Sequence, residues 1–242
     1  MNDTLVIIPT YNEKENIERI IRATFSQDKA FHILVVDDNS PDGTAKIVRD
    51  LQDEFSNSLF IENRKEKTGL GAAYIHGFKW AIEKKYDYII EMDADFSHNP
   101  KDLIRLYKAC KNDNADVSVG SRYIKGKINV VNWDIKRIIL SVLASKYVRF
   151  ITRIPVYDTT AGFVCYHREV LETINLDEIK FVGYAFQIEM KFKAWKHGFK
   201  IKEVEIIFTD RVAGTSKMSG SIISEAVFGV IKMKLKGIKK RH

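Results

Sequence analysis

The first half of the chain alternates short apolar runs with longer segments in which apolar residues recur every three or four positions. The short runs are typical of buried strands and the longer segments of amphipathic helices. The predicted strands are Leu5–Ile8, His32–Val36, Leu59–Ile61, Tyr88–Met92 and Val117–Gly120. The predicted helices are Glu13–Phe25, Thr44–Phe55, Gly69–Lys84 and Pro100–Cys110. This alternation predicts an α/β fold: a Rossmann-like, doubly wound, mostly parallel sheet with helices on both faces.

The second half is less regular. Further helices are predicted over Trp133–Ile151, Tyr184–His197 and Ser221–Lys236, and further strands within Asp158–Tyr166 and Ile201–Phe208. The stretch Ile124–Trp133 is basic and contains Gly126, so we expect a mobile loop that closes over a bound phosphate. The whole pattern predicts one domain over residues 1–220, followed by an amphipathic helix and basic tail over 221–242.

The strand predicted at Tyr88–Met92 ends in two carboxylates one residue apart, Asp93 and Asp95. In an open α/β sheet, ligands bind outside the carboxyl ends of the strands. Carboxylates at that position are hard oxygen ligands, suited to Mg²⁺ or Mn²⁺ held against a substrate phosphate. An isolated Asp-x-Asp is a weak signal, because the same pattern occurs in loops and helix caps.

Two other predicted strands also end in polar clusters, at Pro9–Glu13 and at Asp37–Ser40. A doubly wound sheet brings these clusters and the Asp93–Asp95 pair to one edge, where a nucleotide with a metal-bridged diphosphate would fit. Asn12 and Glu13 also suit a helix N-terminus. Asp38 suits either an Asx turn or a contact to a ribose or base. Gly69-Leu70-Gly71 lacks the full phosphate-loop pattern, so we expect it to serve close helix packing.

Composition places the chain among ordinary globular proteins, with 45% hydrophobic and 29% charged residues in 242. The longest uncharged apolar run near the middle, Ile138–Ser145, is far short of the ~20 residues of a membrane span. No basic segment precedes the first apolar run, so we expect no signal peptide. Cys110 and Cys165 form neither a metal motif nor a disulfide framework, which favours a reducing cytoplasm.

The net charge of 39 − 32 = +7 favours an anionic partner. Residues 232–242 carry six Lys or Arg and no acid. The preceding apolar residues recur at helical spacing: Ile222, Ile223, Ala226, Val227, Val230 and Ile231. This helix either packs on the core with a solvated basic tail or docks on an anionic membrane surface, and both can hold together. The helix at Trp133–Ile151 is a second candidate for membrane contact.

Six motifs occur in a fixed order along nearly the whole chain. They are Pro9-Thr10-Tyr11-Asn12-Glu13, Val36-Asp37-Asp38-Asn39-Ser40, Asp93-Ala94-Asp95-Phe96-Ser97-His98, Gly120-Ser121-Arg122-Tyr123, Gly183-Tyr184-Ala185-Phe186-Gln187-Ile188-Glu189-Met190, and Asp210-Arg211 with Gly214 and Ser216-Lys217-Met218. Together they resemble the dolichol-phosphate (polyprenol-phosphate) mannosyltransferases, which are family-2 glycosyltransferases with the GT-A fold. The last two motifs are the most specific to that branch.

The resemblance implies a role for each matching position. Nucleotide contacts are implied for Pro9, Tyr11, Glu13, Val36 and Asp38 at the guanine and ribose, and for Asp93, Ala94 and Asp95 farther along. Asp95 is the implied principal ligand of Mg²⁺ or Mn²⁺, with Asp93 beside it and Ser97 acting through water where relatives often carry Gln. Contacts to the diphosphate and the acceptor phosphate are implied for Arg122, Arg211 and Lys217. Asp158–Phe163 departs from the usual motif, which affects the acceptor loop.

The reaction implied by the resemblance moves mannose from GDP-mannose to a polyprenyl phosphate, with inversion to a β-linked product. Asp93 would orient the sugar or the metal. The resemblance further implies a peripheral protein on the cytoplasmic face of a membrane, with no nucleic-acid partner.

Alternative functions differ in how well they fit the sequence. A glucosyltransferase that uses UDP-glucose fits nearly as well, and a catalytically silent membrane scaffold fits less well. A phosphorylation-receiver domain needs its acidic pair after the first strand, whereas here a complete strand and helix precede Asp37-Asp38. A processive polysaccharide synthase would carry a Gln-x-x-Arg-Trp motif and membrane spans, and the sequence has neither.

Overall fold

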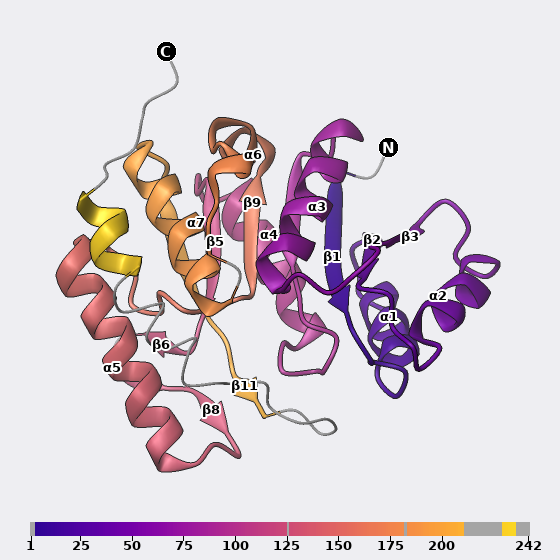
Figure 1. Ribbon diagram of the computed structural model, residues 1–242, viewed down its shortest axis with the longest axis horizontal. Coiled ribbons are helices and arrows are strands. Elements are labelled where there is room, and N and C mark those ends of the chain that lie inside the picture. The colour runs from indigo at the N-terminus through magenta and orange to yellow at the C-terminus, as the bar shows by residue number, and fades with distance from the viewer. Residues whose placement is uncertain (1–2, 125, 182, 211–228, 236–242) are drawn as a thin grey trace.

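The computed structural model describes residues 3–124, 126–181, 183–210 and 229–235. Figure 1 shows a central sheet with helices on both sides, and a long helix, α5 (Ile135–Thr152), along one flank. The predicted α/β class with a mostly parallel, doubly wound sheet is confirmed. The helix predicted over Ser221–Lys236 falls mostly outside the described residues, and its described part, residues 229–235, is helical.

The main sheet has seven strands in the order β10-β5-β9-β4-β1-β2-β3. The strands are β1 (Thr4–Thr10), β2 (His32–Asp37), β3 (Leu59–Asn63), β4 (Tyr88–Glu91), β5 (Val117–Ser121), β9 (Val164–His167) and β10 (Ile201–Glu205). Because β4, β1 and β2 are parallel neighbours, their carboxyl ends lie side by side at one edge. The predicted convergence of three polar strand ends is therefore observed.

Strand β9 is the exception to the parallel arrangement. It pairs antiparallel with both β4 and β5, with Val164 opposite Glu91 and Val119. Its amino end therefore lies at the edge where the neighbouring strands have their carboxyl ends. The segment that leads into β9, from Asp158 to Phe163, is delivered to the same edge as Asp93.

Helices cover both faces because the strands bury apolar side chains on both sides. One core cluster joins the sheet to α3 (Leu70–Glu83), α6 (Arg168–Thr173) and α7 (Tyr184–Lys196). The other joins it to α1 (Ile17–Phe25), α2 (Thr44–Gln52) and α4 (Leu103–Lys111). The predicted helices at Glu13–Phe25 and Pro100–Cys110 begin later than expected, since residues 13–16 form turns and Pro100–Asp102 forms a 3₁₀ turn.

Close packing explains two glycines of α3. A Cβ on Gly71 would lie 2.8 Å from the ring of Phe186 in α7, and one on Gly77 would lie 2.8 Å from Ile7 in β1. Real Cβ atoms do not approach other heavy atoms so closely. The expected packing role of Gly69-Leu70-Gly71 is confirmed at Gly71.

The structure corrects two predictions in the second half. The stretch Ile124–Trp133 contains short strands: β7 (Lys127–Ile128) pairs with β6 (Tyr123–Ile124), and β8 (Val130–Val131) pairs with β11 (Phe208–Thr209). The strand expected over Ile201–Phe208 is split into β10 and β11, because the chain leaves the main sheet after Glu205. The β8–β11 pairing joins residues far apart in sequence, which local patterns do not reveal.

Helix α5 leaves much of its apolar surface uncovered. Ile135, Ile139, Leu143 and Phe150 are exposed, whereas Val148 packs with Ile188 of α7 and with Val230. Residues 229–235 lie against α5 and α7, and Met233 packs there too, while Ile231 is exposed. Among the described residues, no helix combines the length and apolar character needed to cross a bilayer.

Candidate functional site

Asp37 connects the two loops that follow β1 and β2. Its buried carboxylate accepts hydrogen bonds from the Thr10 hydroxyl (2.8 Å) and from the Ser40 backbone and hydroxyl (2.8 and 2.6 Å). The Ser40 hydroxyl oxygen in turn accepts the N–H of Asn12 (3.0 Å). Asp37 therefore fixes both loops and has a structural role, whereas its neighbour Asp38 faces a different set of partners.

Asp38 pairs with Arg64, whose Nη1 lies 2.8 Å from Oδ1. Burial raises the pKa of Asp38, while the Arg64 charge works in the opposite direction. Nearby, the ammonium of Lys67 lies 4.1 Å above the ring of Tyr11. Asp38 and Tyr11 are thus each accompanied by a cation from the segment after β3.

The other predicted nucleotide contacts differ in accessibility. Pro9 is half-buried, and Glu13 accepts a hydrogen bond from Asn16 at 3.0 Å, consistent with its place before α1. Val36 is fully buried within the core. Its side chain serves packing, so the structure does not place it at an exposed ligand surface.

The loop after β4 is organised by His98. The backbone N–H of Asp93 donates to Nδ1 of His98 (3.1 Å), and the buried imidazole stacks on Phe163 with centroids 4.7 Å apart. Because Nδ1 accepts this hydrogen bond, the ring proton lies on Nε2. The 3.8 Å approach of Asp93 Oδ2 to the same nitrogen is therefore not an ion pair.

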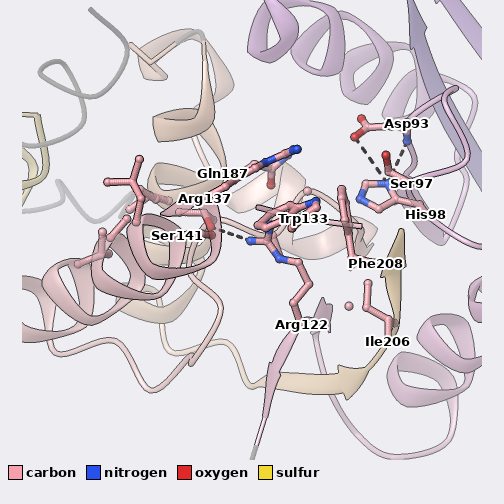
Figure 2. A pocket seen from close by; sticks show the side chains of 18 of the residues that line it. Asp93, Ser97, His98, Arg122, Trp133, Arg137, Ser141, Gln187, Ile206 and Phe208 are labelled. Atoms are coloured by element: carbon pink, nitrogen blue, oxygen red, sulfur yellow. Dashed lines mark hydrogen bonds and ion pairs between the residues drawn. The ribbon is translucent and has the colours of Figure 1, made fainter. Parts of the chain in front are cut away.

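Asp95 and Ala94 are nearly buried, whereas the side chain of Asp93 is 35% exposed. Asp95 Oδ1 accepts the N–H of Ser97 at 3.0 Å, which closes the turn. Asp93 Oδ1 lies 3.4 Å from the hydroxyl of Tyr74. Asp93, Asp95 and Ser97 are therefore brought together at one cavity, and Figure 2 shows Asp93 and Ser97 beside His98.

Arg122, directly after β5, is held by Asp158 from the segment before β9. Nε and Nη2 each lie 2.7 Å from a carboxylate oxygen of Asp158, and Nη2 also donates to Thr160 at 2.8 Å. Burial works to raise the pKa of Asp158, but the Arg122 charge and hydrogen bonds hold it below its usual value. Asp158 belongs to the segment Asp158–Phe163, which departs from the usual family motif. No local sequence pattern predicted its pairing with Arg122.

Aromatic rings enclose the same arginine. The guanidinium of Arg122 lies 5.4 Å from the ring of Trp133 and 5.5 Å from that of Phe208, and the guanidinium of Arg137 lies 4.0 Å from the same Trp133 ring. Figure 2 shows Trp133 beside the guanidinium of Arg122, with Phe208 between them and His98. Arg137 also binds both carboxylate oxygens of Asp210 at 3.0 Å.

One cavity of about 370 Å³ connects these groups. Its polar end contains Asp93, Asp95, Ser97 and His98. Its wall is mainly apolar and comes largely from α5, through Leu140, Leu143, Ala144, Tyr147 and Val148. The cavity therefore has two carboxylates at one end and an apolar wall formed largely by α5.

Two fully buried ionisable side chains interact behind residues that line this cavity. Glu91 of β4 and Lys191 of α7 are both fully buried. Burial raises the pKa of Glu91 to about 8 and lowers the pKa of Lys191 to about 8, while each charge opposes the shift of the other. Lys191 donates to the carbonyl oxygens of Ala161 (2.6 Å) and Gln187 (3.0 Å). It thus ties α7 to the segment before β9.

The motif Gln187-Ile188-Glu189-Met190 divides its roles along α7. Gln187 lines the cavity, and its oxygen faces Lys191 Nζ at 3.4 Å. Glu189 instead accepts the N–H groups of Lys180 and Phe181 and pairs with Lys193, so it holds the preceding loop. The motif indicated a functional site. In the structure, Gln187 lines the cavity, whereas Glu189 holds the loop that precedes α7.

Arg211 and Lys217 lie outside the described residues, so their predicted roles stay predictions. The described chain leads toward them from Asp210, which is fixed to Arg137 beside the cavity.

The donor set fits a divalent cation. Among the described residues, no three His, Cys, Asp or Glu side chains form a closed cation cage. Mg²⁺ and Mn²⁺ are commonly held by one or two carboxylates, with substrate phosphates and water completing the shell. Asp95 and Asp93 are two carboxylates of this chemical type lining one cavity, and Ser97 lines it too.

Comparison of the sequence with known proteins agrees with this geometry. The profile of glycosyl transferase family 2 matches residues 5–174. The chain is 45% identical to a polyprenol monophosphomannose synthase of Mycolicibacterium smegmatis over 97% of this chain and 88% of that protein. It is 42% identical to an undecaprenyl-phosphate mannosyltransferase of Micrococcus luteus over 93% and 91% of the two chains.

Solved structures share the fold at low sequence identity. Glucosyl-3-phosphoglycerate synthase of Mycobacterium tuberculosis, solved with Mn²⁺ and UDP, matches with a TM-score of 0.67 and 16% identity over 97% of this chain and 79% of that one. Mannosyltransferase PcManGT of Pyrobaculum calidifontis, solved with GDP-mannose and Mn²⁺, matches with a TM-score of 0.66 and 19% identity over 99% and 66%.

Proposed function

The chain belongs to glycosyl transferase family 2, and we propose that it transfers mannose from GDP-mannose to a polyprenyl phosphate. The observation that carries the proposal is the cavity in which the Asp93–Asp95 carboxylates meet an apolar wall contributed by α5. A nucleotide diphosphate with its metal suits the carboxylate end. An isoprenoid chain suits the apolar end, because burying its surface is favourable. The 45% and 42% identical mannosyltransferases support the choice of sugar and acceptor class.

The donor nucleotide would lie along the edge formed by β1, β2 and β4. Tyr11 and Asp38 would contact the base and ribose, with Pro9 and Glu13 beside them. Val36 would contribute by packing beneath this edge, since it is fully buried. Ala94 would lie along the nucleotide between the two carboxylates.

Asp95 would be the principal ligand of Mg²⁺ or Mn²⁺, with Asp93 beside it and Ser97 acting through water. The bound cation would supply charge neutralisation for the departing diphosphate. The neighbouring turn, fixed by His98 and by the Ser97 N–H, would hold the two carboxylates in position without rearrangement.

The acceptor phosphate is already anionic near neutral pH, so its attack on the sugar needs no strong general base. Arg122 would lie beside the reacting phosphates, with its orientation fixed by Asp158. Arg211 and Lys217 would add positive charge from the segment that follows Asp210. A single in-line displacement would invert the anomeric carbon and give a β-linked product.

The acceptor is a membrane lipid, so the protein would bind the cytoplasmic face of a membrane from the side of α5. Ile135, Ile139 and Leu143 are exposed on this helix, while Leu140 and Ala144 line the cavity. One helix would thus contact the bilayer and guide the isoprenoid chain toward the carboxylates. No nucleic-acid partner is proposed.

A glucosyltransferase using UDP-glucose is the second candidate, because a related fold has been solved with UDP and Mn²⁺. The test is thermal unfolding with Mn²⁺ and a panel of nucleotide sugars, followed by transfer to a short-chain polyprenyl phosphate. We expect the largest thermal stabilisation and the fastest transfer with GDP-mannose. Larger effects from UDP-glucose would favour the second candidate, and binding without transfer would favour a silent scaffold.

A further inference from the structure

A second hollow, of about 390 Å³, lies at the carboxyl end of α5. We call it the basic hollow. It is lined by Lys146, Arg149, Phe150, Arg153, Ile154 and Pro155. None of these residues is acidic, and within the described part of the chain no ion pair involves its three cations. The carboxylates of the candidate active site line a different cavity, so they do not account for the positive charge of this hollow.

Ring contacts hold the two arginines of the basic hollow. The guanidinium of Arg149 lies 4.1 Å above the ring of Tyr157, and the guanidinium of Arg153 lies 5.6 Å from the ring of Phe150. Arg149 Nε is buried and has no hydrogen-bond partner among the described residues. Stacked guanidinium groups are preorganised for oxyanions such as phosphate. The hollow is therefore suited to an anionic group supplied from outside.

The surface around the basic hollow is apolar. Ile139, Leu143, Lys146 and Phe150 follow one another at spacings of three or four residues and so share one face of α5. Phe150 is 70% exposed, and Leu143 and Ile139 are each more than half exposed. This face is apolar over its first turns and basic near its end, as in helices that lie in a membrane interface.

The neighbouring segment 229–235 extends the same surface. It packs on α5 through Val230 and Met233, and it leaves Lys232 and Leu235 exposed. In Figure 1 this segment lies beside the carboxyl end of α5. Apolar and basic side chains therefore alternate over both helices at this end of the molecule.

We propose that the basic hollow binds the phosphate of an anionic membrane phospholipid, with Phe150 inserted at the headgroup boundary. A soluble anion would neutralise the cations of the basic hollow but would leave Phe150, Leu143 and Ile139 in water. An anionic lipid surface would neutralise the cations and also cover these apolar side chains. The proposal rests on the proposed function in one respect, namely that the acceptor lies in a bilayer. Lipid bound at this end of α5 would orient the helix so that the apolar wall of the reaction cavity meets the membrane.

The test compares two matched double variants of the full chain. Lys146→Gln with Arg149→Gln removes two charges, three residues apart, from α5. Lys46→Gln with Arg49→Gln removes two charges at the same spacing from the surface of α2, on the opposite flank of the sheet. Binding is measured by co-sedimentation with phosphatidylglycerol–phosphatidylcholine vesicles that contain no polyprenyl phosphate. We expect a loss of roughly 25-fold for the α5 variant, from about fivefold per charge, and a much smaller loss for the α2 variant.

Equal losses in the two variants would overturn the proposal, because they would report only net charge. Unchanged binding of the α5 variant would also overturn it. Inorganic phosphate distinguishes the soluble source: if millimolar phosphate stabilises the wild type against heat and the α5 variant does not respond, the hollow is a site for a soluble anion. A Phe150→Trp variant gives an independent readout. We expect its additional fluorescence to shift to shorter wavelength with anionic vesicles, and an unshifted spectrum would contradict insertion.

Mannosyl transfer to a short-chain, detergent-dispersed polyprenyl phosphate separates this proposal from the proposed function. We expect the α5 variant to retain wild-type transfer in that assay. If the wild type binds vesicles through the hollow but transfers no sugar, the proposed function fails and the lipid site stands. If it transfers sugar but the variant binds vesicles normally, the lipid site fails alone.

Discussion

At the scale of single residues, Asp95 is the side chain on which the donor end of the cavity depends most. Its Oδ1 closes the turn with the Ser97 N–H, so an amide at this position keeps the acceptor oxygen while removing the charge. We expect Asp95→Asn to retain the wild-type unfolding temperature and to lose at least about 100-fold in transfer, since the cation loses an anionic ligand. The measurement is turnover as a function of Mn²⁺ concentration.

Asp102→Asn, beyond the turn and at the amino end of α4, is the matched control and should leave turnover unchanged. If Asp95→Asn reaches nearly wild-type turnover at saturating Mn²⁺, Asp95 is not the principal ligand.

Glu91 makes stability depend on pH in a defined direction. Burial raises its pKa from 4.5 to about 8. Between these values the folded chain binds a proton that the unfolded chain has released, so the free energy of unfolding falls as pH rises through the window. Lys191 acts at higher pH: its pKa is lowered from 10.5 to about 8, so its contribution rises from pH 8 to 10.5.

We expect Glu91→Gln to remove the first dependence, so that wild type loses more stability than the variant between pH 5 and 8. The difference should be a few kcal/mol, because one pKa unit corresponds to about 1.4 kcal/mol. Denaturant unfolding at both pH values measures it, with the exposed Glu83→Gln as control. Parallel pH profiles for wild type and Glu91→Gln would show that the Glu91 carboxyl does not titrate in this window.

At the scale of secondary-structure elements, local pattern predicted the strands and helices but not their long-range partners. Strands β1 to β5 were found close to the predicted ranges because each is a buried apolar run ended by polar residues. The reversal of β9, the Arg122–Asp158 pair and the Glu91–Lys191 pair were not predictable, because each joins segments that only the folded topology brings together. The family motifs marked Gln187 and Glu189 but did not distinguish their roles.

The short strands over residues 123–131 also belong to this scale. The mobility of Ile124–Trp133 stays a prediction. A segment that closes over the donor would carry the β6–β7 and β8–β11 pairs with it. We expect amide exchange at 127–131 to slow when GDP-mannose and Mn²⁺ bind, since Trp133 and Phe208 line the cavity beside Arg122. Mass-spectrometric hydrogen exchange measures this, with α2 as the internal reference. Equal exchange with and without donor would argue against closure.

At the scale of the whole molecule, the carboxyl-terminal residues join the fold to the proposed membrane surface. Met233 packs against α5, so a chain ending at Ile231 should be less stable, whereas one ending at Leu235 should keep its unfolding temperature. The longer truncated chain lacks Lys236, Lys239, Lys240 and Arg241. It should bind anionic vesicles more weakly at low salt, with the difference fading near 1 M salt, where the Debye length is about 3 Å.

Vesicle co-sedimentation of both truncated chains, together with their thermal unfolding, measures the two effects separately. If the chain ending at Leu235 binds as the full chain does at low salt, the last residues do not contribute to the anchor.

The reversed strand β9 also has a consequence for how the protein is made. It fills the place beside β4, yet it is synthesised only after β5 and all of α5. At about 5–20 residues per second, the ribosome needs roughly 4 to 15 s to pass from Glu91 to Val164. During that time the half of the sheet formed by β1 to β4 can pair, but β4 remains an open edge. An unpaired buried strand invites association with other chains, so arrested nascent chains ending before Val164 should cross-link to chaperones more readily than chains that extend past His167.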